Sequence, residues 1–256
     1  MSKNFELMQN IGVGLEPSPT PEVSHANPVP IERSGSRRLH TGPFEFDQQA
    51  HEECLQLVQR LFLLQSEPPH CVVFAGIEHG NGCSWICAQI AELLSENTPG
   101  SVCLVEANLR SPSLAQTFGV PNHRGLTDAL LEDGPVADFA KRLRRSNLWL
   151  LSCGSLASDS DFPSLLNSER LSQRLSELRD GFDYVLVDTP PLRQYGDAVT
   201  LGWLADGLVL VLEANSTRRE FARLIAETLQ ATQVKLLAAV LNKRTFPIPR
   251  MLYERL

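Results

Sequence analysis

A glycine-rich loop that follows a short apolar run has residue types that could bind phosphate. The stretch from Ala75 to Trp85 reads AGIEHGNGCSW. In the pattern G-x-x-x-x-G-K-[ST], glycines let backbone N–H groups surround the phosphates, the lysine contacts them and the hydroxyl reaches Mg²⁺. Gly82 and Ser84 fit this pattern, but Cys83 stands where the lysine belongs. The stretch therefore predicts a phosphate site without its usual cation, or a glycine-rich turn that binds nothing.

Two other apolar runs end in polar residues that could complete such a site. The run 184–188 (YVLVD) ends in Asp188, as in a Walker B strand, whose aspartate holds Mg²⁺. An aspartate after a strand can also be only a turn cap. The run 102–106 (VCLVE) is followed by Asn108 and Arg110. Because ligands bind outside the carboxyl ends of parallel strands, we expect these residues to lie near the loop.

The elements that must position these residues alternate along the chain from residue 47 onward. Strands are expected at 71–75, 102–106, 148–152, 184–188, 208–213 and 236–241. Helices are expected at 47–65, 84–96, 164–180, 197–205 and 217–231. Near-continuous Val/Leu strands between helices predict a doubly wound α/β fold, with a mainly parallel sheet covered on both faces.

Composition limits the other possibilities. With 23 Lys and Arg against 30 Asp and Glu, the net charge is −7, which gives no support for nucleic-acid binding. No apolar run approaches the roughly 18 residues of a membrane span, and the start lacks the apolar core of a signal peptide. The six cysteines stand singly, several of them in apolar runs, which favours buried reduced thiols and a cytoplasmic location.

The polar, proline-rich residues 1–45 are expected to be a disordered tail or tether. The folded domain is then expected over 46–243, with a second tail over 244–256. Cys83 leaves another chemistry open, because a thiol at a helix N-terminus can become a reactive thiolate. With Cys87 and His79 nearby it could also form a metal or redox site, although the spacing matches no zinc pattern.

These motifs together resemble the bacterial tyrosine kinases (BY-kinases) of capsule and exopolysaccharide systems. The segments that match, in order within 47–256, are 125–130, 148–154, 165–168, 182–191, 197–198, 205–207, 217–218 and 240–244. The resemblance implies a P-loop NTPase domain that binds ATP and Mg²⁺, autophosphorylates a C-terminal tyrosine cluster and pairs with a transmembrane polysaccharide co-polymerase.

The resemblance also assigns roles to residues. The nucleotide-binding positions would be Gly80, Asn81, Gly82, Cys83, Ser84, Trp85, Arg110 and Asn242. Ser84 and Asp188 would be the Mg²⁺ ligands, and catalysis would depend on Asp188 with positions 83 and 108. Tyr253 is the candidate phosphoacceptor, since it is the one tyrosine in the C-terminal tail.

Four parts of the family pattern are degraded in this chain. The lysine is Cys83, and the Asp-x-Asp-x-Arg motif after the second strand has Glu106 and Asn108 at its acidic positions. The motif E-x-x-R-x-x-R, which closes a ring of subunits, retains its glutamate but has glutamine in place of both arginines, at 56 and 59. The tyrosine cluster is reduced to one residue. Related partition and septum-placement ATPases carry a lysine at the place of Glu78, which disfavours that branch.

Two functions follow as expectations. The first is a catalytically impaired regulatory component with weak or no binding of ATP, ADP and Mg²⁺, weak self-association and a membrane co-polymerase or export protein as partner. Such a chain would lie in the cytoplasm, peripherally at the inner face of the membrane through that partner. The second is an active ATP-dependent autokinase that phosphorylates Tyr253 or a partner.

Overall fold

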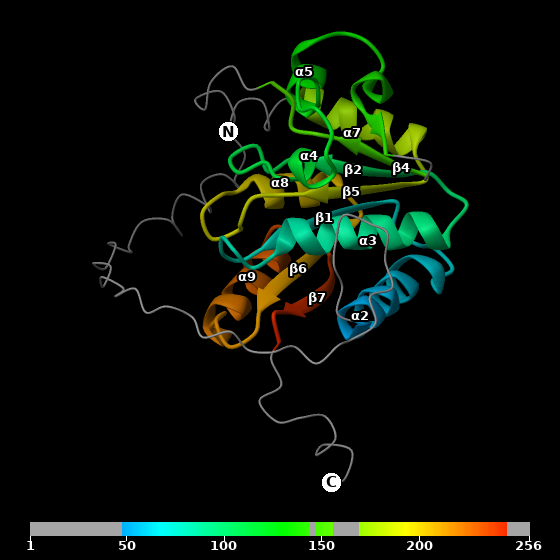
Figure 1. Ribbon diagram of the computed structural model, residues 1–256. Coiled ribbons are helices and arrows are strands. Elements are labelled where there is room, and N and C mark those ends of the chain that lie inside the picture. Colours follow the sequence, from blue (N-terminus) through cyan, green and yellow to red (C-terminus); the bar gives the residue numbers. More distant parts are fainter. Residues whose placement is uncertain (1–47, 144–146, 156–168, 245–256) are drawn as a thin grey trace, which may run out of the picture.

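The computed structural model describes residues 48–143, 147–155 and 169–244, and within them the strands form one sheet (Figure 1). The strand order is β3-β4-β2-β5-β1-β6-β7. The bounds are β1 Cys71–Gly76, β2 Val102–Glu106, β3 Lys141–Arg142, β4 Leu148–Leu151, β5 Tyr184–Asp188, β6 Gly207–Glu213 and β7 Leu236–Asn242. All neighbouring pairs are parallel except β3 and β4. The predicted fold class is confirmed.

Helix α2 precedes β1, and the other helices lie between the strands in the sequence. Their bounds are α2 Gln48–Val58, α3 Cys83–Asn97, α4 Leu114–Thr117, α5 Leu126–Leu131, α7 Glu169–Gly181, α8 Asp197–Leu204 and α9 Arg219–Ala231. The helix expected over 47–65 continues from α2 as a π-helical turn, Gln59–Leu63. In this turn the adjacent Leu61 and Phe62 are both buried in the core. A 3₁₀ turn spans Val136–Phe139.

The sheet has a separate hydrophobic core on each face. Along β1 the side chains alternate, so that Cys71, Val73 and Ala75 enter one core while Val72 and Phe74 enter the other. The second core includes α2 and α3, which lie together on one side of the sheet in Figure 1. The first core includes α5, α7 and α8. Burial on both faces explains why the strands are apolar nearly throughout.

Parallel pairing brings the predicted site residues to one edge of the sheet. β5 lies between β1 and β2, and Glu106 and Asp188 are register partners at the ends of β2 and β5. The backbone N–H of Ala107 donates to the carbonyl of Asp188 at 2.9 Å, and that of Thr189 donates to Phe74 at 3.1 Å. The carboxyl ends of β1, β2 and β5 are thus fixed beside one another.

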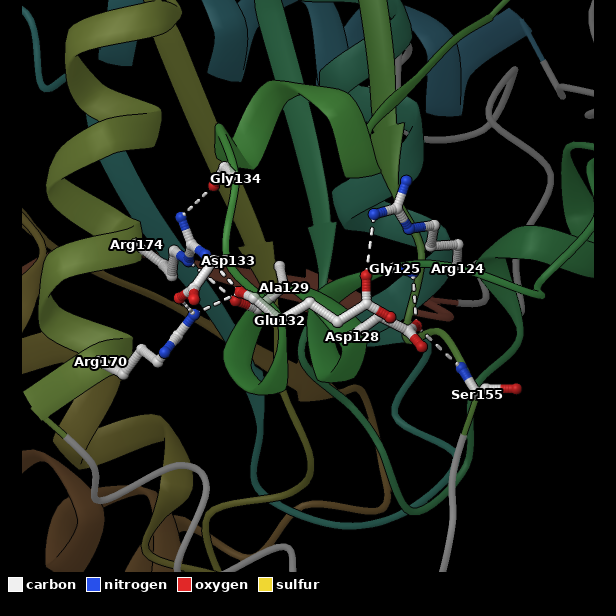
Figure 2. A network of polar contacts seen from close by, with 10 residues as sticks. All are labelled: Arg124, Gly125, Asp128, Ala129, Glu132, Asp133, Gly134, Ser155, Arg170 and Arg174. Atoms are coloured by element: carbon white, nitrogen blue, oxygen red, sulfur yellow. Dashed lines mark hydrogen bonds and ion pairs between the residues drawn. The ribbon is translucent and has the colours of Figure 1, made fainter.

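Several residues of the family-like segment 125–130 hold the fold together. Asp128 Oδ2 accepts hydrogen bonds from the backbone N–H groups of Gly125 and Ser155 (Figure 2). A Cβ atom at Gly125 would overlap the carbonyl of Ser152, and one at Gly154 would overlap the Asp128 carboxylate. The glycines therefore let the start of α5 approach the segment that follows β4.

A buried arginine fastens α7 to the segment that follows α5 (Figure 2). Arg174 is 5% exposed, and its guanidinium donates to the carbonyls of Ala129, Glu132 and Gly134 at 2.7–2.8 Å. It also pairs with Glu177 at 2.7 Å. One planar cation thus binds three carbonyls of the same short segment. Only a guanidinium has enough N–H donors, in a fixed planar arrangement, to do this.

Arg174→Lys is expected to lower the free energy of unfolding by about 1–2 kcal/mol, because an ammonium keeps the charge but loses part of the hydrogen-bond set. Urea unfolding measures the change. Arg170→Lys is the matched control, since Arg170 lies on the same helix, is 34% exposed, donates to the Glu132 carbonyl and pairs with the fully exposed Asp133. We expect that control to change stability by less than about 0.5 kcal/mol. Equal losses would contradict a special role for Arg174.

Some expectations lie outside what the structure describes or are only partly covered by it. The tails at 1–45 and 245–256, with Tyr253, and the start of the helix expected at 164–180 fall outside the described residues. Among the described residues no helix is both long and apolar enough to cross a membrane. All six cysteines are free, five of them buried and Cys83 partly buried, in agreement with single reduced thiols.

Candidate phosphate-binding site

The loop between β1 and α3 has the backbone form of an anion cradle. Gly80 and Gly82 adopt left-handed conformations, with φ of 85° and 82°, which side chains other than glycine rarely tolerate. α3 starts at Cys83, so its first N–H groups have no partner inside the helix. These groups and the positive end of the helix dipole are suited to bind an anion. This geometry requires no lysine.

Side chains from the ends of β6 and β7 hold the loop in this form. Asn81 is 2% exposed, and its amide accepts from the Glu78 N–H at 2.8 Å and donates to Glu213 at 3.3 Å. Asn242 donates to the carbonyl of Asn81 at 2.9 Å. A Cβ atom at Gly82 would overlap this Asn242 amide. The side chains of Asn81 and Asn242 thus support the loop, whose backbone faces any ligand.

Cys83 lies at the centre of the site against Asp188. Burial is the main cause that raises the pKa of the Cys83 thiol well above its usual range, and the nearby Asp188 carboxyl raises it further. The pKa of Cys87 is raised for the same two reasons. A reactive thiolate at either position is therefore disfavoured, which answers the alternative that the sequence left open. Among the described residues no three His, Cys, Asp or Glu side chains form a metal-like cluster.

Asp188 is a buried acid with unmet hydrogen-bonding capacity. Its side chain is 1% exposed, and burial raises its pKa to about 7, with Glu106 adding to the rise. The Ser84 hydroxyl and the Cys83 thiol lie close enough to lower that pKa in part. Neither carboxylate oxygen has a hydrogen-bond partner of ordinary geometry among the described residues. The site thus holds acceptor oxygens for a ligand or metal ion, in an acid whose pKa is raised by burial.

Glu106 and Asn108, which the sequence analysis treated together, have different roles at the end of β2. Glu106 is fully buried, and its carboxylate accepts from the backbone N–H groups of Ser113 and Leu114 at 2.5 Å and of Cys153 at 3.2 Å. It therefore caps α4 and ties it to the segment that follows β4. Asn108 is 8% exposed, and its Oδ1 has no hydrogen-bond partner in the described part of the chain. Glu106 thus has a structural role, whereas Asn108 keeps an acceptor oxygen that a ligand could use.

The remaining predicted residues take different places. The Arg110 guanidinium lies 4.0 Å from the centre of the Tyr195 ring and 3.5 Å from the Asp197 carboxylate, beside the site. Trp85 is partly buried and packs against the core under α3. The contacts of two acids of the site were missed by sequence reasoning. Glu213 joins Asn81 to Lys243, and Glu78 pairs with Arg193. Both contacts join segments far apart in the sequence, so no local pattern signals them.

The geometry agrees with a P-loop of a known kinase family. No protein-family model matches the chain. Over 163 residues, it is 31% identical to the tyrosine-protein kinase YwqD of Bacillus subtilis (strain 168), a match that covers 64% of this chain and 68% of that kinase. The chain belongs to the bacterial tyrosine kinase family.

Other comparisons of this BY-kinase relate it to longer proteins and to a solved domain. Over 182 residues it is 27% identical to the succinoglycan biosynthesis transport protein ExoP of Rhizobium meliloti (strain 1021), covering 71% of this chain and 23% of that protein. The kinase domain of the Escherichia coli tyrosine kinase ETK matches with a TM-score of 0.70 and 20% identity over 80% of each chain. This last likeness shows the shared fold.

Proposed function

We propose that this BY-kinase is a catalytically impaired regulatory component of capsule or exopolysaccharide biosynthesis or export, with weak or no ATP binding. One observation carries the proposal. The Cys83 thiol lies against the buried Asp188 carboxyl where the P-loop pattern places a lysine. The cradle of backbone N–H groups is present, but the cation that would contact the β- and γ-phosphates is absent from that position.

The binding free energy lost with the lysine is large enough to favour an impaired enzyme. One charged hydrogen bond contributes about 1.5–3 kcal/mol, so ATP affinity would be about ten- to a hundredfold below that of a lysine-containing loop. Phosphoryl transfer depends on positioning and charge stabilisation, so the transition state should lose more than the ground state. Asn108 adds to the loss, because an amide cannot take up a proton as a carboxylate can.

The residues present suit a magnesium nucleotide in part. The unpartnered oxygens of Asp188 and the hydroxyl of Ser84 are the oxygen donors that Mg²⁺ prefers, and together they would hold the ion. Mg²⁺ would supply charge neutralisation at the phosphates. The protein would supply the N–H groups of the loop from Gly80 to Trp85. Asn242 holds the loop in place, and Arg110 lies beside the site, where it pairs with Asp197.

The partner is inferred from the relatives. ExoP is a transport protein of which this chain covers 23%, so we propose a membrane polysaccharide co-polymerase or export protein as the partner. The chain would then lie at the inner face of the cell membrane, with its proline-rich residues 1–45 as a tether. Self-association is proposed to be weak, because exposed Gln56 and Gln59 occupy the positions of the ring-closing arginines. A ring at low micromolar concentration would contradict that part.

Incubation with ATP and Mg²⁺ tests the proposal directly. We expect no phosphate adduct by intact mass and no anti-phosphotyrosine signal, because the loop has no cation at position 83 and position 108 has no carboxylate. The variant that carries both Cys83→Lys and Asn108→Asp is the positive control, because it has the lysine and the carboxylate and should give a phosphate signal in the same assay. A phosphotyrosine signal on Tyr253 of the unchanged protein would instead establish the autokinase.

A further inference from the structure

An ion pair closes the phosphate-binding loop from the side of β5. Glu78 is a loop residue, and its carboxylate pairs with the guanidinium of Arg193, which follows β5. The two side chains are 33% and 42% exposed. Neither residue belongs to the P-loop pattern, and the contact joins positions 115 residues apart. The pair therefore places one positive and one negative charge at the mouth of the loop.

The backbone around Arg193 is fixed to the loop. The N–H of Leu192 donates to the carbonyl of Gly76 at 2.9 Å, and that of Arg193 donates to Ile77 at 3.1 Å. The Arg193 guanidinium also lies 4.5 Å from the centre of the Phe221 ring of α9. Two backbone hydrogen bonds and an aromatic face thus hold the cation beside the loop even if its acidic partner changes.

Other cations near the loop are paired with acids outside it. Lys243 pairs with Glu213 at 3.2 Å, and Arg110 pairs with Asp197 at 3.5 Å. Arg193 differs because its partner is itself part of the loop. An exposed ion pair is only weakly stable, so a doubly or triply charged anion can displace the carboxylate. Displacement would leave Glu78 unpaired beside that anion and would therefore oppose binding.

We propose that the Glu78–Arg193 pair is a latch that sets the affinity of the loop for phosphate groups. A phosphate-bearing anion in the loop competes with Glu78 for Arg193, so that Glu78 weakens binding and Arg193 strengthens it. This inference deepens the proposed function and rests on the loop being a nucleotide site. It identifies a regulatory acid and a compensating cation in a loop that lacks its lysine.

Calorimetry with ADP at low ionic strength tests the latch on the full chain. Glu78→Gln is expected to tighten binding about tenfold, and Arg193→Gln to weaken it about tenfold, the size of one charged contact. In the Arg193→Gln background, Glu78→Gln should gain clearly less than tenfold, because no guanidinium is released. Glu227→Gln is the matched control. It breaks the exposed Arg223–Glu227 pair of α9 and should leave the affinity unchanged.

The same set is made in a Cys83→Lys background, so that binding is measurable if the unchanged loop binds too weakly. If Cys83→Lys bound ADP with the same affinity whether or not it also carried Glu78→Gln, the latch would be wrong and the nucleotide site would still be supported. If no variant bound ADP, including the folded Cys83→Lys protein, the nucleotide site and the latch would both be wrong. Equal gains from Glu78→Gln with and without Arg193 would show simple repulsion by Glu78 and no latch.

Discussion

Replacing Cys83 by lysine is expected to strengthen ATP binding about ten- to a hundredfold. The left-handed Gly80 and Gly82 and the start of α3 already give the backbone its anion-binding form. The contacts of Asn81 and Asn242 hold that form without help from position 83. The substitution therefore adds a charge to an existing cradle, and calorimetry with ATP and Mg²⁺ measures the gain.

The introduced ammonium has a second effect through Asp188. It would lie beside a carboxyl whose pKa is raised to about 7, and a neighbouring positive charge favours the ionised form. The acid would then carry the charge that a Mg²⁺ ligand needs. Cys83→Met is the matched control, because methionine adds length without charge. If methionine raised the affinity as much as lysine, packing rather than charge would explain the gain.

Binding alone should not restore phosphotransfer. Glu106 is occupied by three backbone N–H groups, so the metal side of the site depends on Asp188 and position 108. Adding Asn108→Asp to Cys83→Lys should permit slow hydrolysis or phosphotransfer, more than the sum of the single variants, because both act on one Mg²⁺–phosphate assembly. Wild-type ATP affinity equal to that of the lysine variant would refute the impaired-enzyme proposal.

The strands could be predicted from the sequence because both faces of the sheet are buried. Apolar runs bounded by loops gave the six longer strands to within one residue at each end. Even β7, which lies at the edge of the sheet and is partly exposed, is an apolar run and was predicted for that reason. The two-residue β3 and the short helices α4 and α5 were missed, since segments of two to six residues show too little periodicity.

The site was only partly predictable for a different reason. The P-loop and the Asp188 strand are local patterns, and the sheet brings them together as expected. The capping of α4 by Glu106, the support of Asn81 by Glu213 and the pairing of Glu78 with Arg193 are tertiary contacts. Sequence reasoning treated Glu106 as one of the two acidic positions of the motif at the end of β2, whereas in the structure its carboxylate accepts from backbone N–H groups at the start of α4 and from that of Cys153, just after β4.

Asp188→Asn is expected to stabilise the protein at pH 8 in the absence of nucleotide and metal. The pKa of this carboxyl rises from 3.8 to about 7 on folding, so the native state binds a proton that the unfolded state releases. The free energy of unfolding therefore falls as pH rises from about 4 to about 7, and the penalty remains above that range. At 1.36 kcal/mol per pKa unit, the gain from the substitution would reach about 2–4 kcal/mol.

Urea unfolding in a chelating buffer at pH 5.5 and pH 8 measures this effect as the difference between variant and unchanged protein. Because the carboxyl ionises near 3.8 in the unfolded state and near 7 in the folded state, about half of the gain should already be present at pH 5.5, and the full gain at pH 8. Asp183→Asn is the matched control, for which we expect a change in stability of opposite sign. Hydrogen bonds from Ser101 lower the pKa of that exposed carboxyl, so its loss should destabilise the fold at neutral pH.

The same measurement connects stability to function. An acid that stays buried without hydrogen bonds of ordinary geometry from the described residues costs stability and is retained where a ligand or metal ion uses it. If Mg²⁺ with ADP binds at Asp188, adding both should raise the stability of the unchanged protein at pH 8 but not that of Asp188→Asn. An Asp188→Asn variant no more stable than the unchanged protein at pH 8 would show that this carboxyl is not a destabilising charge. The inference of a ligand-directed acid would then fail.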